Sequence, residues 1–230
     1  MTRKMPIVAL VPVRGFAQGK QRLAPVLSSR ERHALVCAML EDVLEALRGA
    51  RGIAVSLVVS GDAEVLPVAE AAGAILLPDV PEGGLNGSLQ AAAAWVAAAF
   101  PGHALLVVVA DLPVLTPALL AASVLADPAD VVIVRSVDGG TNLLLQRPPP
   151  AVRFAFGRGS CARHRQAALT AGRTVTVIEH AVLERDFDTP DDLTALLPLP
   201  AAGRTIRLLQ HLRLSKQGAA RREVSATRGA

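Results

Sequence analysis

The stretch IVALVPVRGFAQGKQRLAPVL, residues 7–27, begins as an apolar run and turns abruptly into a cationic loop. Residues 7–13 are apolar on both faces, which is typical of a strand buried between two layers of helices. The loop that follows has two glycines, Gly15 and Gly19, and three cations. These cations are Arg14, Lys20 and Arg22. Because glycines expose backbone N–H groups and cations neutralise charge, the loop favours the binding of an anion such as a phosphate, although a solvated basic loop is the simpler alternative.

Short β-rich runs alternate with longer helical patterns along the rest of the chain. Strands that are apolar on both faces and separated by helices predict a mostly parallel twisted sheet that helices cover on both sides. The fold class is therefore α/β. The predicted strands are 7–13, 53–59, 74–77, 104–109, 130–135, 142–146 and 174–178.

Capping residues mark the starts of three helices. Ser28, with Glu31 three residues later, forms a capping-box pattern, and apolar residues then recur at spacings of three and four, which predicts a helix over 28–48. Thr116 and Thr189 each precede a proline that suits the first helical turn. Two of these helices follow predicted strands closely, as expected for an α/β sheet.

Composition limits the class of protein. A chain of 230 residues with 51% apolar residues is long and apolar enough for one large domain. No apolar run reaches the roughly 18 to 20 residues of a membrane span, and the N-terminal segment does not resemble a cleaved signal. The two cysteines, Cys37 and Cys161, suggest neither a disulfide framework nor a zinc site. We therefore expect a cytoplasmic protein with no membrane span.

The net charge of +4 is concentrated at the C-terminal end. Residues 201–230 carry +6, which leaves −2 for residues 1–200. Because the body is not basic and tyrosine is absent, we expect no nucleic-acid partner. The proline-rich segment PLPAAG at 198–203 predicts a boundary between one domain, 1–200, and a basic tail, 201–230, that is partly disordered or a short amphipathic helix.

Carboxylates stand where strands are expected to end. Asp111 follows the apolar run of the strand 104–109, and burial of such a charge is costly unless it is paired or binds a cation. Asp186 and Asp188 are two residues apart, so in an extended chain they point the same way. The three aspartates predict a carboxylate cage for one or two divalent ions, whereas Asp191 and Asp192 suit the first turn of a helix.

Two glycine-rich turns and one helix start complete the candidates. DGGTNLLL brings Thr141 to the start of a strand, and FAFGRGSCARH leads from Gly157 into a helix that begins near Ser160. Glycines before a helix expose N–H groups to a phosphate or carboxylate, although each could be a plain turn or cap. In PEGGLNGSLQ, Leu85 and Asn86 could contact a purine, with an N-cap role for Asn86 as the alternative. Together these features predict phosphate chemistry with magnesium.

In this order the motifs VPVRGFAQGKQRLAPVL, GGLNGSLQAA, VVVADLPVLTPALL, DGGTNLLLQRPP, FAFGRGSCARH and LERDFDTPDDL resemble those of the CofC-like guanylyltransferases of coenzyme F-420 biosynthesis. This family is a branch of the nucleotide-diphospho-sugar transferase fold and is similar to the molybdenum-cofactor nucleotidyltransferases. The resemblance covers residues 6 to 197 and leaves out the tail. It implies transfer of GMP from GTP to 2-phospholactate, phosphoenolpyruvate or 3-phosphoglycerate.

The resemblance also implies roles for individual residues. Asp111, Asp186 and Asp188 match the magnesium ligands. Thr141, Gly157 and Ser160 match the acceptor-binding positions. Arg14, Gly15, Lys20 and Arg22 match the loop that binds the triphosphate, with Lys20, Arg14 and Asp111 as the catalytic residues, and Leu85 and Asn86 match the guanine side. The chain departs from the family pattern at Arg14, Gln21 and Arg158, which puts local phosphate contacts and the choice of acceptor in doubt.

Several alternatives stay open at this point. A different nucleotidyltransferase, acting on a sugar phosphate or a pterin, is the main one, and a non-catalytic nucleotide-binding domain is another. A hydrolase built on Ser160, Cys161 and His164 is disfavoured because the G-x-S-x-G elbow is missing. The resemblance further implies coupling to the enzyme that consumes the unstable product, and it leaves open whether the chain forms a homodimer.

Overall fold

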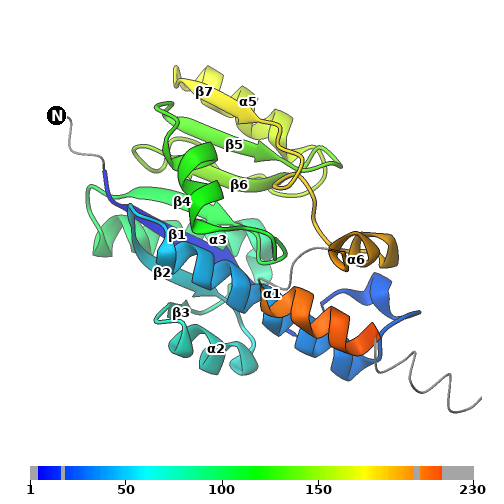
Figure 1. Cartoon of the computed structure of the whole chain (residues 1–230). Helices are drawn as coiled ribbons and strands as arrows, with labels where there is room; N and C mark the ends of the chain where they lie inside the picture. The colour runs from blue at the N-terminus through cyan, green and yellow to red at the C-terminus, as the bar shows by residue number, and fades with distance from the viewer. Residues whose placement is uncertain (1–4, 17–18, 199–202, 214–230) are drawn as a thin grey trace, which may run out of the picture.

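The structure, a computed structural model, describes residues 5–16, 19–198 and 203–213. Its centre is a seven-stranded sheet of order β3-β2-β1-β4-β6-β5-β7 (Figure 1). The strands are β1 (Ile7–Pro12), β2 (Ile53–Val59), β3 (Ile75–Leu77), β4 (Ala104–Val108), β5 (Val131–Arg135), β6 (Thr141–Gln146) and β7 (Val175–Ile178). All seven strands predicted from the sequence are therefore confirmed, with ends that differ by at most one residue.

Strand direction determines which loops meet. β1 pairs in parallel with β2 and β4, β2 with β3, and β5 with β7, whereas β6 is antiparallel to both β4 and β5. The first residue of β6, Thr141, therefore lies at the same edge of the sheet as the last residues of the other six strands. In an open α/β sheet this edge is where ligands bind.

Helices cover both faces of the sheet, as the α/β prediction requires (Figure 1). Ala9 and Val11 of β1 point into a core shared with α1, α2 and α4, while Val8 and Leu10 point into a core shared with α3 and α5. The helices are α1 (Ser29–Gly49), α2 (Leu66–Ala71), α3 (Gly84–Ala99), α4 (Pro117–Leu120), α5 (Ser160–Thr170) and α6 (Pro190–Leu196). Four short helical turns are η1 (Gln21–Leu23), η2 (Ala63–Val65), η3 (Pro81–Gly83) and η4 (Ala121–Leu125).

The predicted helix starts are confirmed by their caps. Ser28 accepts a hydrogen bond from the N–H of Glu31, whose carboxylate accepts one in return from the N–H of Ser28. Thr116 caps α4, and Thr189 forms a capping box with Asp192 at the start of α6.

A third apolar cluster lies beside the sheet. It joins η1, the first half of α1, α6 and a helix at residues 204–213. Leu23, Leu35, Phe187 and Leu209 are among its buried members. Asp42 of α1 accepts hydrogen bonds from the N–H groups of Arg204 and Thr205. It therefore caps the N-terminus of helix 204–213, although it belongs to a different helix. Residues 204–213 thus pack on the body of the protein.

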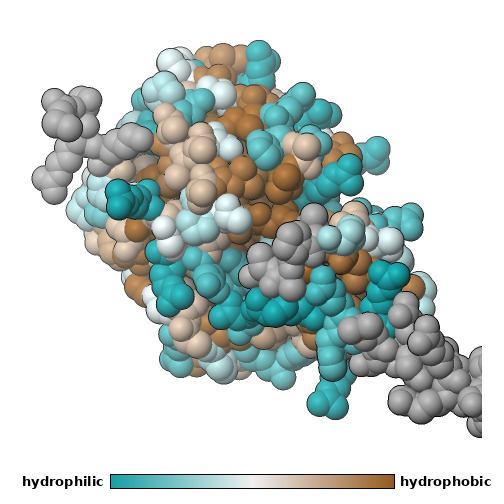
Figure 2. Space-filling view, viewed as in Figure 1, coloured by the Kyte–Doolittle hydropathy of each residue, from teal (hydrophilic) through white to brown (hydrophobic). Residues whose placement is uncertain are grey.

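The surface differs between the two sides of the view in Figure 2. Hydrophilic residues cover most of the outer side of α1, whereas apolar residues gather above it, over the part of the sheet that holds β4, β5 and β6. Within the residues that the structure describes, we find no helix with the length and apolar character needed to cross a membrane.

Candidate functional site

Hydrogen bonds from one backbone group and one side chain gather three predicted loops at one edge of the sheet. The N–H of Val109 donates to the carbonyl of Asn142 (3.0 Å), which joins the end of β4 to the start of β6. The side-chain amide of Asn142 donates to the carbonyl of Leu183 (2.9 Å). Asp111, Thr141 and the segment that leads to Asp186 and Asp188 are therefore neighbours in space, although up to 77 residues separate them in sequence.

Lys20 joins two of the predicted aspartates. Its Nζ lies 2.8 Å from Oδ2 of Asp111 and 2.5 Å from Oδ1 of Asp188. The side chain of Lys20 is 7% exposed, whereas the carboxylates of Asp111 and Asp188 are 29% and 38% exposed. We call these three residues, together with Asp186, the charged corner. Its cation is covered by protein, while its carboxylates remain open to a ligand.

The backbone of the first loop brings Lys20 to this position. Lys20 itself has a φ of 54°, in the left-handed region, and immediately precedes η1. Upstream, the N–H of Phe16 donates to Asp62 at 2.9 Å. Gly15 has a φ of 109°, and a Cβ there would lie 2.7 Å from Oδ2 of Asp62. Any other residue at position 15 would therefore force Asp62 and the loop apart.

The electrostatics of the charged corner leave an excess of negative charge. Burial would lower the pKa of Lys20, but attraction to Asp111 and Asp188 outweighs it and raises the pKa. Burial raises the pKa of Asp186, and the nearby charges of Asp111 and Asp188 add to the effect. Three carboxylates thus face one lysine, a set of hard oxygen ligands that fits a divalent cation such as Mg²⁺.

The carboxylates are not arranged around a common point. Among the described residues no group of three or more Asp, Glu, His or Cys side chains converges with the geometry of a metal site. The ammonium group of Lys20 stands between Asp111 and Asp188, where an ion would have to bind. The predicted cage therefore stays a prediction, and it requires Lys20 to move.

The segment that carries Asp186 and Asp188 is anchored by the buried side chain of Phe187 and by hydrogen bonds to Asp192. Phe187, between them, is 4% exposed and packs into the third cluster. Because neighbouring side chains in an extended segment point to opposite sides, burial of Phe187 turns both aspartates outward. The carboxylate of Asp192 accepts hydrogen bonds from the N–H groups of Asp188 and Thr189 (3.2 and 2.7 Å) and so fixes the end of the segment.

A second group of side chains, which we call the neutral corner, is fully buried. The hydroxyl of Ser160, at the start of α5, donates to Oγ1 of Thr141 at 2.9 Å. Oγ1 of Thr141 lies 3.0 Å from Nδ1 of His164, and the N–H of Ala155 donates to Nε2 of the same ring at 2.9 Å. Thr141 is 5% exposed, and Ser160 and His164 are 0% exposed. Thr141 and Ser160, both predicted to bind the acceptor, are thus in direct contact.

Two turns support the neutral corner. Asp138 accepts hydrogen bonds from the hydroxyl of Ser136 and from the N–H of Gly140, and these bonds lower its pKa. A Cβ on Gly140 would lie 2.7 Å from the Ser136 hydroxyl oxygen, so the turn accepts only glycine there. The N–H of Cys161 donates to the carbonyl of Gly139 (3.2 Å), which ties the two predicted glycine turns together.

Asn86 connects α3 to the second of these turns. Its Oδ1 accepts a hydrogen bond from the N–H of Phe156 (2.7 Å), and its Nδ2 donates to the carbonyl of Phe156 (3.2 Å). Since α3 begins at Gly84, Asn86 is not its N-cap. Leu85 is partly buried against the neighbouring core. Beside them a cavity of about 480 Å³ is lined by Asn86, Gln90, Arg153 and Phe154, among others.

The remaining predicted residues lie at the surface of the site. Arg14, Arg22 and Gly157 are exposed, and the hydrogen bonds described for the charged corner involve neither arginine. Sequence reasoning missed Asp62, the anchor of the first loop, and the part His164 takes in the neutral corner. The spacing of Ser160 and His164 indicated their proximity, but Thr141, which bonds to both, is far away in sequence.

The neutral corner does not have the arrangement of a hydrolase. The Thr141 hydroxyl separates His164 from Ser160, and the second ring nitrogen already accepts the N–H of Ala155. Burial, aided by the charge of Arg163, lowers the pKa of His164 to about 4, so the ring is a poor base at neutral pH. The geometry therefore argues against a serine or cysteine nucleophile activated by His164.

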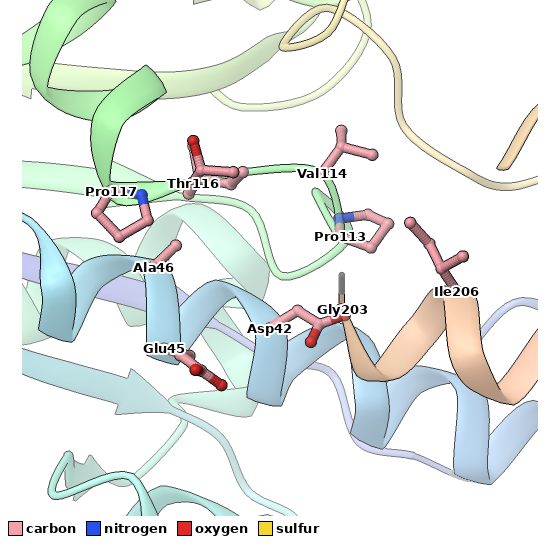
Figure 3. Close-up of a pocket in the computed structure, with 10 residues that line it drawn as sticks. Asp42, Glu45, Ala46, Pro113, Val114, Thr116, Pro117, Gly203 and Ile206 are labelled. Atoms are coloured by element: carbon pink, nitrogen blue, oxygen red, sulfur yellow. The ribbon is translucent and has the colours of Figure 1, made fainter. Parts of the chain in front are cut away.

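A further cavity, of about 310 Å³, is lined by none of the residues of the two corners. It is bounded by α1, the loop that leads to α4 and the start of helix 204–213 (Figure 3). The carboxylate of Asp42 points toward Gly203 there, where it serves as the cap described above (Figure 3). Residues 199–202, next to Gly203, lie outside the described residues, so we assign this cavity no ligand.

Comparison with solved structures identifies the fold. The chain superposes on a protein from Desulfovibrio desulfuricans G20, named provisionally as a nucleotide-diphospho-sugar transferase, with a TM-score of 0.73 and 18% identity over 90% of this chain and 97% of the other. A 4-diphosphocytidyl-2C-methyl-D-erythritol synthase gives 0.54 and 16% identity over 83% and 96%. At these identities the likeness supports the nucleotide-diphospho-sugar transferase fold and nothing further.

Comparison of sequences identifies the family. The profile described as "Guanylyl transferase CofC like" matches residues 7–227. The phosphoenolpyruvate guanylyltransferase of Conexibacter woesei is 38% identical over 87% of this chain and 91% of its own length. The 3-phospho-D-glycerate enzyme of Phenylobacterium zucineum is 37% identical (89% and 96%), and the 2-phospho-L-lactate enzyme of Methanothermobacter thermautotrophicus is 35% identical (96% and 99%). This chain therefore belongs to the CofC-like guanylyl transferase family.

Proposed function

We propose that this protein transfers GMP from GTP to a phosphorylated three-carbon acid and releases pyrophosphate. Its relatives that act on phosphoenolpyruvate, 3-phosphoglycerate and 2-phospholactate support the reaction class. The observation that carries the proposal is the juxtaposition of the charged corner and the neutral corner at one edge of the sheet. A phosphate acceptor and a metal-bound triphosphate need these two environments side by side.

The acceptor needs alignment more than activation. A phosphate monoester is already ionised at neutral pH, with a second pKa of about 6, so its oxygen can attack the α-phosphorus of GTP without a general base. Consistent with this, the buried imidazole of the neutral corner is occupied at both nitrogens. The hydroxyls of Thr141 and Ser160, with the backbone around Gly157, would hold the acceptor anion while the reaction proceeds.

The charged corner would receive the triphosphate and its ion. Asp111, Asp186 and Asp188 would hold Mg²⁺, which when bound supplies charge that stabilises the leaving pyrophosphate. Lys20 is a long side chain on a loop, so it can leave the two carboxylates and turn to a phosphate. Arg14 and Arg22, both exposed, would add positive charge at the mouth of the site, and Gly15, buried against Asp62, would let the loop take the path that brings Lys20 there.

The guanine would lie beside the start of α3. Leu85 offers apolar surface to a base, and the cavity next to Asn86 opens at the same turn of the helix. One proton of the Asn86 amide is used by Phe156, which leaves the other for a purine edge. We further propose that the reaction belongs to coenzyme F-420 biosynthesis and takes place in the cytoplasm, where its charged substrates are made.

The experiment is pyrophosphate release from the purified protein with GTP and magnesium. 2-Phospholactate, phosphoenolpyruvate and 3-phosphoglycerate are offered separately, with ATP and CTP as control nucleotides. Release that requires GTP and one of the acids supports the proposal and identifies the acceptor. Because the product is expected to be unstable, the assay is repeated with a second enzyme added, one that consumes this product in the pathway of a relative.

A second nucleotidyltransferase activity is tested in the same assay. Pyrophosphate release with CTP or with a sugar phosphate, and none with the three acids, would favour the wider fold family over the guanylyltransferases. Silence with every pair, from protein that unfolds cooperatively, would contradict the proposal and favour a nucleotide-binding domain.

A further inference from the structure

His164 has a position that the proposed reaction does not itself explain. It lies on the second turn of α5, is 0% exposed, and contacts both glycine-rich segments of the neutral corner. One ring nitrogen faces Thr141 at the start of β6, and the other faces the backbone of Ala155. Its ring also packs edge-on against Phe156, with ring centroids 5.1 Å apart.

The contact with Ala155 fixes the tautomer of the ring. A backbone N–H can only donate, so Nε2 of His164 must accept and cannot carry a proton. The proton of the neutral ring is therefore on Nδ1, and Nδ1–H donates to Oγ1 of Thr141. The low pKa of His164, about 4, agrees with a neutral ring at pH 7.

This tautomer leaves the pair of hydroxyls with one spare donor. Nδ1–H, the Thr141 hydroxyl and the Ser160 hydroxyl supply three protons, whereas two contacts join the three groups. Because Thr141 accepts from His164, it cannot donate to it. Because Ser160 also donates to Thr141, the hydroxyl proton of Thr141 has no acceptor in the hydrogen bonds described among these residues. A ligand oxygen is the acceptor that such a buried proton requires.

We propose that His164 is a positioning residue, which fixes the hydroxyl of Thr141 so that it donates to the phosphorylated acceptor. With the opposite tautomer, Thr141 would donate to the ring and the spare proton would be lost. The inference rests on the proposed function, because it takes the neutral corner as the acceptor site. It adds a residue that touches neither substrate.

Two substitutions separate the two contacts of the ring. His164→Asn keeps an N–H near the position of Nδ1 and gives up the contact with Ala155. His164→Gln keeps an acceptor near the position of Nε2 and gives up the donor to Thr141. Gln166→Ala, on the exposed side of the same helix, is the matched control.

The measurement is KM for the acid that the wild type uses, alongside KM for GTP. We expect His164→Gln to raise the acceptor KM about tenfold, the effect of one lost hydrogen bond, with the GTP KM within about twofold of wild type. His164→Asn should stay within about threefold for both, as should Gln166→Ala. A loss confined to His164→Asn, or equal losses for both substrates in both variants, would overturn the inference.

Nitrogen NMR of uniformly labelled wild-type protein tests the inference without turnover. We expect a neutral His164 ring protonated on Nδ1 at pH 7, identified by its absence from both variants, and a shift of that Nδ1–H on addition of phosphoenolpyruvate or inorganic phosphate. A ring protonated on Nε2 would overturn the inference even if the variants fail to fold. A wild type with the expected tautomer and phosphate shift, but no turnover with any acid, would instead count against the proposed function alone.

Discussion

The charged corner and the neutral corner lie at the same edge of the sheet but are built in opposite ways. The charged corner joins Lys20 to Asp111 and Asp188, all on long or exposed side chains, through ion pairs that a ligand can replace. The neutral corner joins Thr141, Ser160 and His164 through uncharged hydrogen bonds with no measurable exposure at two of the three residues. The ion pairs of the charged corner can therefore exchange partners when a ligand binds, whereas the hydrogen bonds of the neutral corner are already formed.

Under the proposed function, the difference suits the groups that each substrate would present. A metal and a triphosphate would bring several charges, and the carboxylates and Lys20 would then exchange partners. A single phosphate needs only a few fixed donors, and fixed donors cost no rearrangement when the ligand binds. We expect the largest effects on activity from the charged corner and the largest effects on stability from the neutral one.

The largest effect should come from Asp111. Asp111→Asn removes one carboxylate of the charged corner while the Lys20–Asp188 ion pair remains. By analogy with the loss of one group that stabilises a transition state, turnover should fall roughly 100- to 1000-fold, measured as pyrophosphate release in saturating magnesium. Asp191→Asn, an exposed carboxylate in the first turn of α6, is the control. Near wild-type turnover in Asp111→Asn would mean that this carboxylate holds no ion.

Lys20 should rank next. Lys20→Met leaves three carboxylates without their cation and removes a charge from the triphosphate site, so we expect a fall of roughly 10- to 100-fold in kcat/KM for GTP. Lys20→Arg keeps the charge but changes its geometry and should recover part of the loss. Arg22→Gln, an exposed cation of the same loop, should cost about threefold or less. If kcat/KM for GTP fell equally in all three variants, the buried Lys20 would have no larger role than the exposed Arg22.

His164 of the neutral corner should make the free energy of unfolding depend on pH. Burial lowers the pKa of His164 to about 4, below the ordinary value of 6.5. As pH falls from 6.5 to 4, the unfolded chain therefore takes up a proton that the folded chain does not, and stability falls by about 3 kcal/mol through this window. Urea unfolding at several pH values should show this slope in the wild type and lack it in His164→Gln.

An exposed histidine is the control for that slope. His211→Gln, on the outer side of helix 204–213, should leave the wild-type slope in place. Parallel stability curves for the wild type and His164→Gln would show that burial does not keep this ring neutral.

The smallest effect should come from the link between α3 and the neutral corner. Asn86→Ala leaves the N–H and the carbonyl of Phe156 without partners, which should lower the free energy of unfolding by about 1 to 3 kcal/mol. Denaturant unfolding measures it, with Gln90→Ala, which lines the same cavity, as the control. If both variants lower the free energy of unfolding by the same amount, the two hydrogen bonds between Asn86 and Phe156 do not contribute to stability beyond the packing of the side chain.

Most of the fold could be predicted because its signals are local. Strands that are apolar on both faces stand out in any window of five residues, and Ser28, Thr116 and Thr189 mark helix starts through contacts three residues away. The direction of β6 relative to β5 was also predictable, because only five residues, including Asp138 and Gly139, join the two strands, and so short a connection fits an antiparallel pair. The pairing of β6 with β4 was not predictable in the same way, because β6 is buried on both faces like its neighbours and nothing in residues 141–146 indicates which second strand it contacts.

The site was predictable only in part, for the same reason. Asp111 could be singled out because it ends a buried strand, and the glycines of the two turns are visible as composition. The ion pair of Lys20 with Asp188 joins residues 168 positions apart, and the contact of Asn86 with Phe156 joins residues 70 apart. Such partners follow from the order of strands in the sheet, which the sequence pattern leaves undetermined.

The burial of Phe187 in a cluster that includes Leu209 has a consequence for the timing of synthesis. Phe187 turns Asp186 and Asp188 outward, and the cluster that buries it includes Leu209 on helix 204–213. A ribosome makes Leu209 after every residue of both corners, so a growing chain has all of its reactive groups before it has the support that aims two of them. We therefore expect the direction of these two carboxylates to be fully fixed only after this helix has emerged and docked.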